Sequence, residues 1–568
     1  MKIIGINNEM YISSAALLDQ GEIIAASAEE RLNRIKLDRS FPLRSIEFCL
    51  DVGNVEVSDI EYFTTSWNPA AYFQKYNPLF SGKRRHLVEQ LYSVGDHLAN
   101  FTGRKSSDFT YQEIPQGKDT LKIYHITHHR AHAAYAFYLS GFENAAFLTS
   151  DSQGEFESST WGIGTDREIK VQGSINYPNS IAALYGMITE FLGFQPNSDE
   201  WKVMALGSYA ERNNSFYKKM KNELLSWNKD NPYELNLNYF KGHVQDQPKI
   251  YSSKLLDLLG ECRHRNDELN PKHYEIASAL QQICEEAMAS MLRRIHQQTK
   301  EKKICLAGGF FMNSVFNGKV LQDTPFEDCF IGPAPDDSGN CLGSSLYLYH
   351  HILEKPRKEA LRHNYFGPEF NNDFIGRELE NRKIKAHYAK NVEEKVAKYI
   401  SDGKIVGWFQ GRMEFGQRAL GNRSILADPR NPNAKKLVNA AVKFREAFRP
   451  FAPAVLIEKQ NQYFDIGNER AVPFMEKVLP VLAEKQESIP AVVHADGSGR
   501  IQSVSHETNP KFHGLIEEFE KLTGIPILLN TSFNLNGEPI VCSPRDALKT
   551  FYNCGLDILV LGNYIIFK

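Results

Sequence analysis

The alternation of hydrophobic and polar positions predicts two three-stranded meanders near the start of the chain. The first has strands at 2–7, 14–18 and 22–26, with a tight turn at 19–21. The second has strands at 145–150, 158–164 and 169–173, with a turn at 165–166. Short alternating runs that are broken by such turns are typical of antiparallel strands. Two units of the same form predict a duplicated α/β fold in which each half offers a polar loop to a cleft.

Helical spacing and glycine-rich strand ends organise the segments that follow. The residues after His128 look helical, 181–192 repeats the pattern, and apolar residues at helical spacing over 276–295 predict a long core helix. A predicted strand at 303–307 runs into Gly308-Gly309, and paired glycines let a backbone approach a ligand closely. A second polar loop, 331–339, carries Asp336 and Asp337 just before another predicted helix.

A candidate metal site begins at His128 and His132. Residues four apart lie on one face of a helix, one turn from each other, so the two imidazoles can share an ion. The second meander delivers Asp151 from a strand end, and two histidines with a carboxylate make a plausible open metal site. Taken alone, histidines at this spacing are more often packing or solvated residues.

A second candidate site lies in the basic stretch 412–449. The stretch contains nine Arg and Lys residues and only three acidic ones, Glu414, Asp428 and Glu446. Several of the basic residues are interleaved with glycines and apolar residues. A solvated basic face is the ordinary interpretation of such a run. Convergent cations in a structured loop instead suit a polyanion such as a triphosphate. A predicted strand at 525–529 then leads to Ser532 and Asn534, short polar groups at a strand end that fit a nucleotide.

Length and composition bound the class of protein. With 568 residues, several domains are expected, and 42% hydrophobic and 24% charged residues are ordinary for a soluble globular protein. A net charge of −3 argues against a surface built for nucleic acid, and apolar runs are too short to span a membrane. Eight cysteines without a C-x-x-C pair indicate reduced thiols, hence a cytoplasmic location. We expect domains at 1–355 and 376–568, joined by a polar linker at 356–375.

Several long blocks, taken together, resemble the O-carbamoyltransferases of the NodU/CmcH family over nearly the full length. They include 128–132 (H-x-x-x-H), 151–155 (DSQGE), 202–204 (KVM), 307–313 (AGG with Asn313), 415–424 (FGQRALGNRS), 442–453 (VKFRE and FRPFAP) and 529–539 (LNTSFNLNGEP). The resemblance implies a duplicated actin/sugar-kinase-like domain, similar to that of tRNA threonylcarbamoyl-transferases, followed by a YrdC-like α/β domain. The C-terminal domain would make carbamoyl-adenylate from ATP and carbamoyl phosphate. The N-terminal domain would transfer the carbamoyl group to a hydroxyl of a natural product or sugar at an iron site.

The family's functional residues carry over by position. The resemblance implies that Fe²⁺ is held by His128, His132, Asp151 and Asp337; we choose Asp337 over Asp336 because it directly precedes a Ser-Gly turn. It implies that ATP, with Mg²⁺, and carbamoyl phosphate are bound by Arg418, Lys443, Arg449, Arg500, Ser532 and Asn534. It places Lys202, Gly308, Gly309 and Asn313 along the nucleotide cleft of the transfer domain. Catalytic roles fall to His128, His132, Arg418 and Lys443.

One departure from the family keeps other functions open. The family usually has a His-Asp pair in the first meander loop, where this chain has Tyr11-Ile12. The alternatives are therefore a carbamoyl- or threonylcarbamoyl-adenylate enzyme with another acceptor such as tRNA, or a regulator that binds metal and nucleotide without catalysis. Hydrogenase maturation proteins are disfavoured because they add an acylphosphatase domain and C-x-x-C zinc fingers. Acceptor specificity is expected in 65–115 and 210–270, the segments that match the family least.

Overall fold

The computed structural model describes residues 1–568 except 9–10, 69–107, 117–118, 228–231, 243–248 and 444–447. The chain divides into two compact units. The first holds 1–24 and 49–361, and the second holds 25–48 and 362–568. The chain passes from the first unit to the second between 361 and 362, and 25–48 packs with the C-terminal unit. Arg34 contributes to this packing because its guanidinium donates to the carbonyls of Pro539 and Ile540.

The first unit is built on two sheets that share a five-strand topology; one of them adds β5 at its edge, and the end of its strand β3 belongs to the second unit. In one the order is β3-β2-β1-β4-β6-β5, built from β1 (Lys2–Asn7), β2 (Ser14–Asp19), β3 (Glu22–Ala28), β4 (Tyr62–Thr65), β5 (Phe109–Gln116) and β6 (Asp119–Ile126). In the other the order is β13-β12-β7-β8-β9, built from β7 (Asn144–Ser150), β8 (Glu157–Thr165), β9 (Glu168–Asn176), β12 (Lys303–Ala307) and β13 (Asp328–Ile331). Each sheet begins with an antiparallel meander and continues with two parallel strands. The predicted duplication is confirmed.

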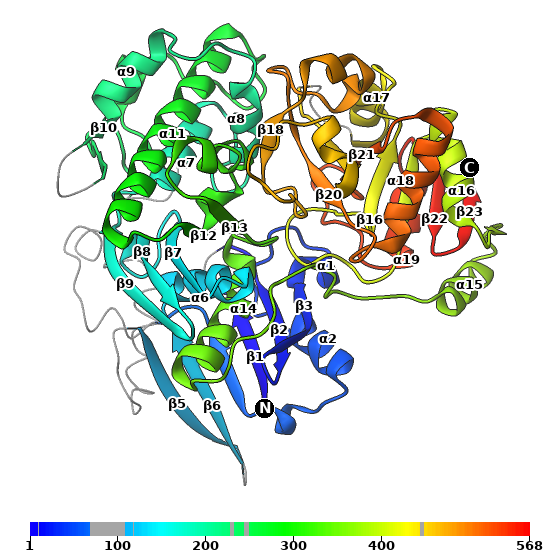
Figure 1. The fold of residues 1–568 in the computed structure, drawn as a ribbon, viewed down its shortest axis with the longest axis horizontal. Helices are drawn as coiled ribbons and strands as arrows, with labels where there is room; N and C mark the ends of the chain where they lie inside the picture. The colour runs from blue at the N-terminus through cyan, green and yellow to red at the C-terminus, as the bar shows by residue number, and fades with distance from the viewer. Residues whose placement is uncertain (9–10, 69–107, 117–118, 228–231, 243–248, 444–447) are drawn as a thin grey trace. The chain divides into compact units, whose positions relative to one another are not determined.

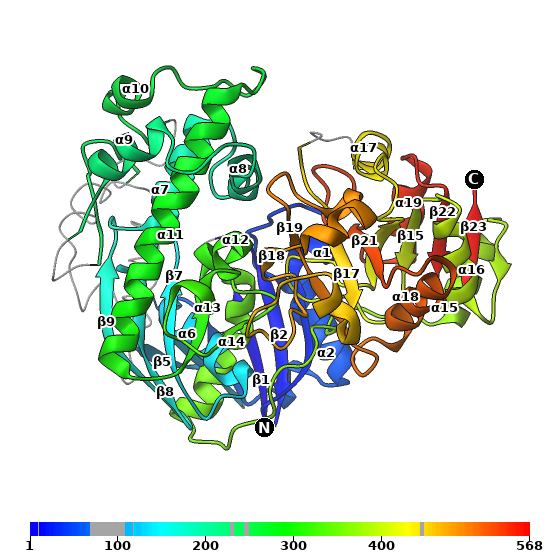
Figure 2. The same cartoon turned by 45° about the horizontal axis from the view of Figure 1, so that its top comes forward.

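Helices cover these sheets and carry the polar loops (Figures 1 and 2). They are α2 (Leu43–Gly53), α6 (His128–Ser140), α7 (Ile181–Phe191), α8 (Glu200–Gly207), α9 (Ser215–Leu224), α10 (Ser253–Leu259), α11 (Pro271–Thr299), α12 (Ser314–Asn317), α13 (Val320–Asp323) and α14 (Asn340–Leu346). The predicted long core helix is α11, which lies on β8 through a hydrogen bond from Trp161 Nε1 to Gln298 Oε1 of 3.0 Å. The short strands β10 (Leu225–Ser226) and β11 (Glu234–Leu235) complete the segment 210–270 as described.

The small residues of α6 and α14 allow these two helices to approach closely. A Cβ added to Gly343 would lie 2.1 Å from the carbonyl oxygen of Ala131, so only glycine fits there. Almost every residue of α6, from His128 to Ser140, is buried. The N-terminus of α6 and the loop that precedes α14 are thereby held against each other inside the first unit.

The second unit is an eight-stranded mixed sheet with helices on both faces. Its order is β14-β23-β22-β15-β16-β21-β17-β20, from β14 (His387–Tyr388), β15 (Val406–Phe409), β16 (Arg423–Ala427), β17 (Ala452–Leu456), β20 (Gln502–Val504), β21 (Ile527–Ser532), β22 (Ile558–Leu561) and β23 (Tyr564–Phe567). Two cores form because successive strand residues point to opposite faces: Leu426 and Leu528 join one, and Ile425 and Leu529 the other. Helices α16 (Val392–Ser401) and α18 (Pro510–Thr523) pack on the first core, and α15 (Asn372–Asn381) and α19 (Pro544–Tyr552) on the second.

The remaining short elements of the second unit are α1 (Glu29–Asn33), α17 (Ala434–Leu437) and the strand pair β18 (Val478–Pro480) with β19 (Ser498–Arg500).

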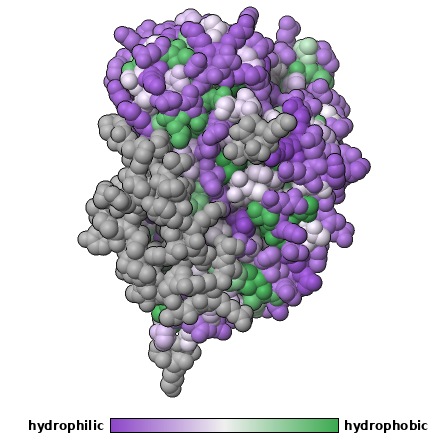
Figure 3. Space-filling model, turned by 90° about the vertical axis from the view of Figure 1, so that its left-hand side faces the viewer, coloured by the Kyte–Doolittle hydropathy of each residue, from purple (hydrophilic) through white to green (hydrophobic). Residues whose placement is uncertain are grey.

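On the visible face in Figure 3, hydrophilic side chains predominate among the coloured residues and hydrophobic ones are scattered in small groups. Within the described part of the chain, none of the helices combines the length and apolar character that crossing a membrane requires.

Candidate functional site

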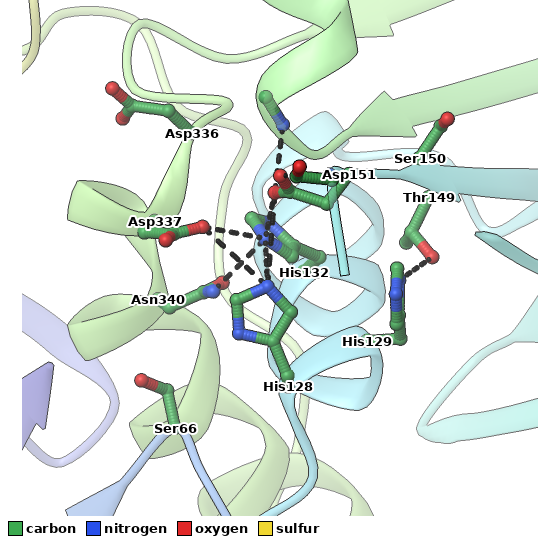
Figure 4. Close-up of polar contacts among 12 residues, drawn as sticks. Ser66, His128, His129, His132, Thr149, Ser150, Asp151, Asp336, Asp337 and Asn340 are labelled. Carbon is green, nitrogen blue, oxygen red and sulfur yellow. Dashed lines mark hydrogen bonds and ion pairs between the residues drawn. The ribbon is translucent and has the colours of Figure 1, made fainter. Parts of the chain in front are cut away.

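Four buried or nearly buried side chains converge in the first unit (Figure 4). His128 and His132 come from the first turns of α6, Asp151 follows β7, and Asp337 opens the turn before α14. Their ligand atoms all lie within 4.8 Å of one another. The two Nε2 atoms are 3.1 Å apart, and His132 Nε2 lies 3.2 Å from Asp151 Oδ2 and 3.4 Å from Asp337 Oδ1. The structure therefore brings together the four residues predicted to bind metal.

The spacing and chemistry of these donors fit a single metal ion. Donors that share an ion at about 2.0–2.2 Å lie roughly 3–3.5 Å from each other. His128 Nε2 is 3.7 Å from Asp151 Oδ2 and 3.5 Å from Asp337 Oδ1, so all the measured pairs fall near this range. Asp337 Oδ1 is also buried and accepts no hydrogen bond from the described residues. Two imidazoles and two carboxylates form a set that suits a first-row transition metal with open positions.

The electrostatics of the cluster call for a cation. Burial alone would lower the pKa of His132, but the neighbouring carboxylates of Asp151 and Asp337 outweigh it and raise the pKa to about 9. Burial would likewise raise the pKa of Asp151, yet His128 and His132 hold it well below its usual range. The two carboxylates thus favour positive charge on the His132 imidazole. A divalent ion would supply that charge in place of the proton.

Gly308 and Gly309 support Asp151. The backbone N–H of Gly309 donates to Asp151 Oδ2 at 2.9 Å, and the N–H of Ser152 donates to Oδ1 at 2.6 Å. Gly308 has a φ of +102°, and a Cβ there would lie 2.2 Å from the Ser150 carbonyl oxygen. The paired glycines let the end of β12 pass against the end of β7, which orients a carboxylate of the cluster.

Glu155 anchors the helix that carries the two histidines. Its carboxylate accepts the backbone N–H of His128 at 3.1 Å and that of Asn68 at 2.7 Å. A carboxylate at a helix N-terminus is favoured by the free N–H groups and the helix dipole. Burial raises the pKa of Glu155 to about 7. The motif 151–155 was recognised in the sequence, but this role of its last residue depends on tertiary contacts that the motif does not display.

Two neighbouring polar residues lie outside the cluster. His129 places Nδ1 2.8 Å from Thr149 Oγ1 and Nε2 3.0 Å from the Glu157 carbonyl oxygen, and burial holds its pKa well below the usual value. Asp336 accepts a hydrogen bond from Ser338 Oγ at 2.5 Å, and burial raises its pKa to about 6. In Figure 4 Asp337 points into the cluster and Asp336 away from it.

The first meander loop adjoins the loop that carries Asp337. Ser14 Oγ donates to the carbonyl of Ser338 at 2.9 Å, so the two loops are neighbours. Ile12 is buried, and its carbonyl accepts from Asn7 Nδ2 at 2.6 Å. An apolar side chain is therefore packed in the first meander loop, beside the loop that carries Asp337.

Lys202 and Asn313 belong to two segments that meet. Lys202 forms an ion pair of 3.0 Å with Asp199, and Asn313 caps α12 by accepting the N–H of Phe316 at 3.1 Å. The adjacent residues Met204 and Ser314 touch, with Ser314 Oγ 4.0 Å from the Met204 sulfur. Asn313 also exchanges hydrogen bonds with Gln281 of α11.

In the second unit, strand pairing brings the segments that carry five of the six predicted nucleotide residues, all but Lys443, to one end of the sheet. Ser424 of β16 pairs with Ser532 of β21, and Ala452 of β17 pairs with Asn530. The segments bearing Arg418 and Arg449, which precede β16 and β17, therefore reach the strand end that bears Ser532 and Asn534. Arg500 joins them because β20 pairs in parallel with β17, with Gln502 opposite Ala454.

Lys443 lies at the same strand end. Its buried ammonium donates to Asn534 Oδ1 at 2.9 Å, to the Asn534 carbonyl at 3.0 Å and to the Ser532 carbonyl. Three predicted residues are thus in direct contact. The contacts hold the ammonium at the end of β21.

Other cations of the basic stretch have structural partners. Arg423 is fully buried, stacks 3.6 Å from the centre of the Phe409 ring and donates to the carbonyls of Gln410 and Pro368. Burial lowers the pKa of Arg423 to about 10. Arg430 pairs with Asp428 at 2.6 Å. The stretch is therefore neither a uniformly solvated face nor a uniform anion site.

Comparisons with known proteins cover both units. A family model described as "Carbamoyltransferase N-terminus" matches residues 2–346, and one described as "Carbamoyltransferase C-terminus" matches 397–568. Nodulation protein NolNO of Sinorhizobium fredii is 36% identical over 99% of this chain and 80% of its own length. An uncharacterized protein of Synechocystis is 34% identical over 100% of this chain and 96% of its own. Among solved structures, the activator of 2-hydroxyisocaproyl-CoA dehydratase from Clostridium difficile is 12% identical, covering 62% of this chain and 96% of its own, with a TM-score of 0.31.

Proposed function

We infer the function from the family: this chain belongs to the carbamoyltransferases, and it is an enzyme that transfers a carbamoyl group. We propose that ATP drives the transfer in two steps. In the first step carbamoyl phosphate, ATP and one water give carbamoyl-adenylate, phosphate and pyrophosphate. In the second step a hydroxyl oxygen of a small-molecule acceptor bonds to the carbamoyl carbon, AMP leaves and a proton is released.

The observation that carries the proposal is the buried cluster of His128, His132, Asp151 and Asp337 in the unit matched by the N-terminal family model. These residues would hold Fe²⁺. When bound, the ion would supply Lewis acidity that polarises the carbamoyl carbonyl. Gly309 and Glu155 would keep Asp151 and α6 in position, because outer contacts of this kind orient metal ligands.

The adenylate would form in the second unit, at the end of the sheet where β21 ends. Joining ATP and carbamoyl phosphate brings several negative charges together, and fixed cations lower the cost of that approach. Arg418, Lys443, Arg449 and Arg500 belong to segments that gather at this end of the sheet. Ser532 and Asn534 hold the Lys443 ammonium and would offer polar groups to the nucleotide. Mg²⁺ would accompany ATP.

The nucleotide would also reach the transfer unit. Lys202, Gly308, Gly309 and Asn313 lie on segments that follow β12 or contact that region. A glycine pair at a strand end leaves room for a phosphate-bearing group near the backbone. The acceptor would be a hydroxylated natural product or sugar. Of the segments expected to select it, 69–107, 228–231 and 243–248 lie outside the described residues.

The proposal is tested by incubating the full chain with ATP, carbamoyl phosphate and a panel of hydroxylated metabolites, and by following each acceptor by mass spectrometry. One acceptor is expected to gain a single carbamoyl unit only when both co-substrates are present. Omission of ATP and omission of carbamoyl phosphate are the controls. Transfer that continues without ATP would contradict the adenylate route.

A further inference from the structure

We propose that Asn340 is a fifth protein residue of the metal centre and that its side-chain oxygen binds the ion. This inference rests on the proposed metal site and adds a residue that the sequence did not single out. Asn340 is the first residue of α14, three positions after Asp337, and it is fully buried. Its Nδ2 lies 3.1 Å from His132 Nε2. In Figure 4 Asn340 points into the cluster from the start of α14, directly after the turn that carries Asp337.

The side-chain amide of Asn340 has more hydrogen-bonding groups than partners. Asn340 Oδ1 is buried and has no hydrogen-bond partner among the described residues. The neighbour of Nδ2 is His132 Nε2, the atom that His132 would offer to the ion. With that lone pair on a metal, the NH₂ group would lose its acceptor. Both ends of a fully buried amide would then lack a partner, which is strongly unfavourable.

Turning the amide by half a rotation would leave one end instead of both without a partner, because the oxygen could then bind the ion. The oxygen and nitrogen of an asparagine side chain have the same shape, and their assignment follows from the bonds they make. The turn places Oδ1 near the present position of Nδ2, 3.1 Å from His132 Nε2. That distance equals the 3.1 Å between His128 Nε2 and His132 Nε2, a pair already spaced to share an ion. A neutral carbonyl oxygen adds a donor to two carboxylates and two imidazoles without adding charge.

Cobalt(II) binding to the full chain tests the assignment without ATP, carbamoyl phosphate or acceptor. The visible d–d bands of Co²⁺ report coordination number, and a titration gives the Kd. For Asn340→Ala we expect a Kd about 10- to 100-fold higher and a changed band intensity. The matched control is Asn317→Ala, another fully buried asparagine of the same unit, which donates to the Phe311 carbonyl. Its Co²⁺ spectrum is expected to match that of the unmodified protein.

A second variant decides the case if Asn340→Ala does not fold. Asn340→Asp keeps the shape and supplies a charged oxygen, so its Kd is expected to be equal to or lower than that of the unmodified protein, with altered bands. Unchanged Kd and spectrum in Asn340→Ala, or in Asn340→Asp, would overturn the assignment while leaving the proposed metal site intact. Failure of the unmodified protein to bind Co²⁺ would overturn both the assignment and the metal site. Carbamoyl transfer is assayed separately, so the outcome for Asn340 does not decide whether the protein transfers a carbamoyl group.

Discussion

At the residue scale, His132 is the centre of the proposed metal site. Its Nε2 faces both carboxylates and the other imidazole, whereas His129, one helix position after His128, is engaged by Thr149 and Glu157. His132→Ala is therefore expected to weaken Fe²⁺ or Co²⁺ binding by at least about 100-fold. His129→Asn, the matched buried control, is expected to retain the metal. Metal content after reconstitution checks this, and equal metal in both variants would rule out His132 as a ligand.

Proton competition predicts how metal binding depends on pH. The pKa of His132 is raised to about 9, so in the metal-free protein the imidazole carries a proton that the ion must displace. The Kd for Co²⁺ is expected to fall about tenfold per pH unit between pH 7 and 9 and to level off above that. Titrations at several pH values measure the slope. A Kd independent of pH over this window would contradict the assignment of this proton to the cluster.

Site residues could be predicted from the sequence where their role depends on neighbours along the chain, and not where it depends on contacts across the fold. The spacing of His128 and His132 is a helical property, and the strand pattern before Asp151 is visible in the sequence. Asp337 came from the family resemblance. Glu155 and Asn340 act across the fold, on the N-terminus of α6 and on His132, and nothing in the adjacent sequence distinguishes them from ordinary polar residues.

At the scale of elements, the close approach of the chain after β12 to the end of its parallel neighbour β7 depends on Gly308. A side chain there would meet the Ser150 carbonyl oxygen at 2.2 Å and would require a φ of +102°. Gly308→Ala is expected to destabilise the first unit by about 3 kcal/mol or more and to weaken Co²⁺ binding through Gly309 and Asp151.

The control for that prediction is Gly260→Ala in the same unit. Gly260 also has positive φ, +78°, but an added Cβ meets only the flexible end of Lys272. Gly260→Ala is expected to cost about 2 kcal/mol, because a φ of +78° with a ψ of −166° suits essentially only glycine, and to leave Co²⁺ binding unchanged. Calorimetric unfolding with Co²⁺ titration distinguishes the two, and similar effects of both substitutions would show that the close approach of these strand ends does not depend on Gly308.

The duplication of elements was predictable because each meander consists of short apolar runs between clear turns. The strands β5 and β6 were not predicted, since a hairpin beside a parallel pair has no separate signal in the pattern. The grouping of 25–48 with the C-terminal unit was also missed. It depends on long-range contacts such as that of Arg31 with the Gly416 carbonyl at 3.1 Å.

At the scale of the whole molecule, the two proposed chemical steps belong to different units: adenylate formation to the second unit and carbamoyl transfer to the first. Lys443→Ala removes a cation from the strand end of the second unit and is expected to lower pyrophosphate release by at least about 100-fold. Metal content should stay at one ion per chain because His128, His132, Asp151 and Asp337 all belong to the first unit. Lys459→Ala, a more exposed lysine paired with Glu520, is the control and should retain activity. Loss of metal in Lys443→Ala would contradict the separation of sites.

The central claim is that this carbamoyltransferase activates its carbamoyl group with ATP, and pyrophosphate release by the unmodified, metal-loaded protein tests it most directly. The measurement does not require the acceptor, because the adenylate forms before transfer. We predict that pyrophosphate appears from ATP when carbamoyl phosphate is present and stays at background when it is omitted. A folded protein that binds ATP but releases no pyrophosphate with carbamoyl phosphate, or releases it equally without, would contradict the account.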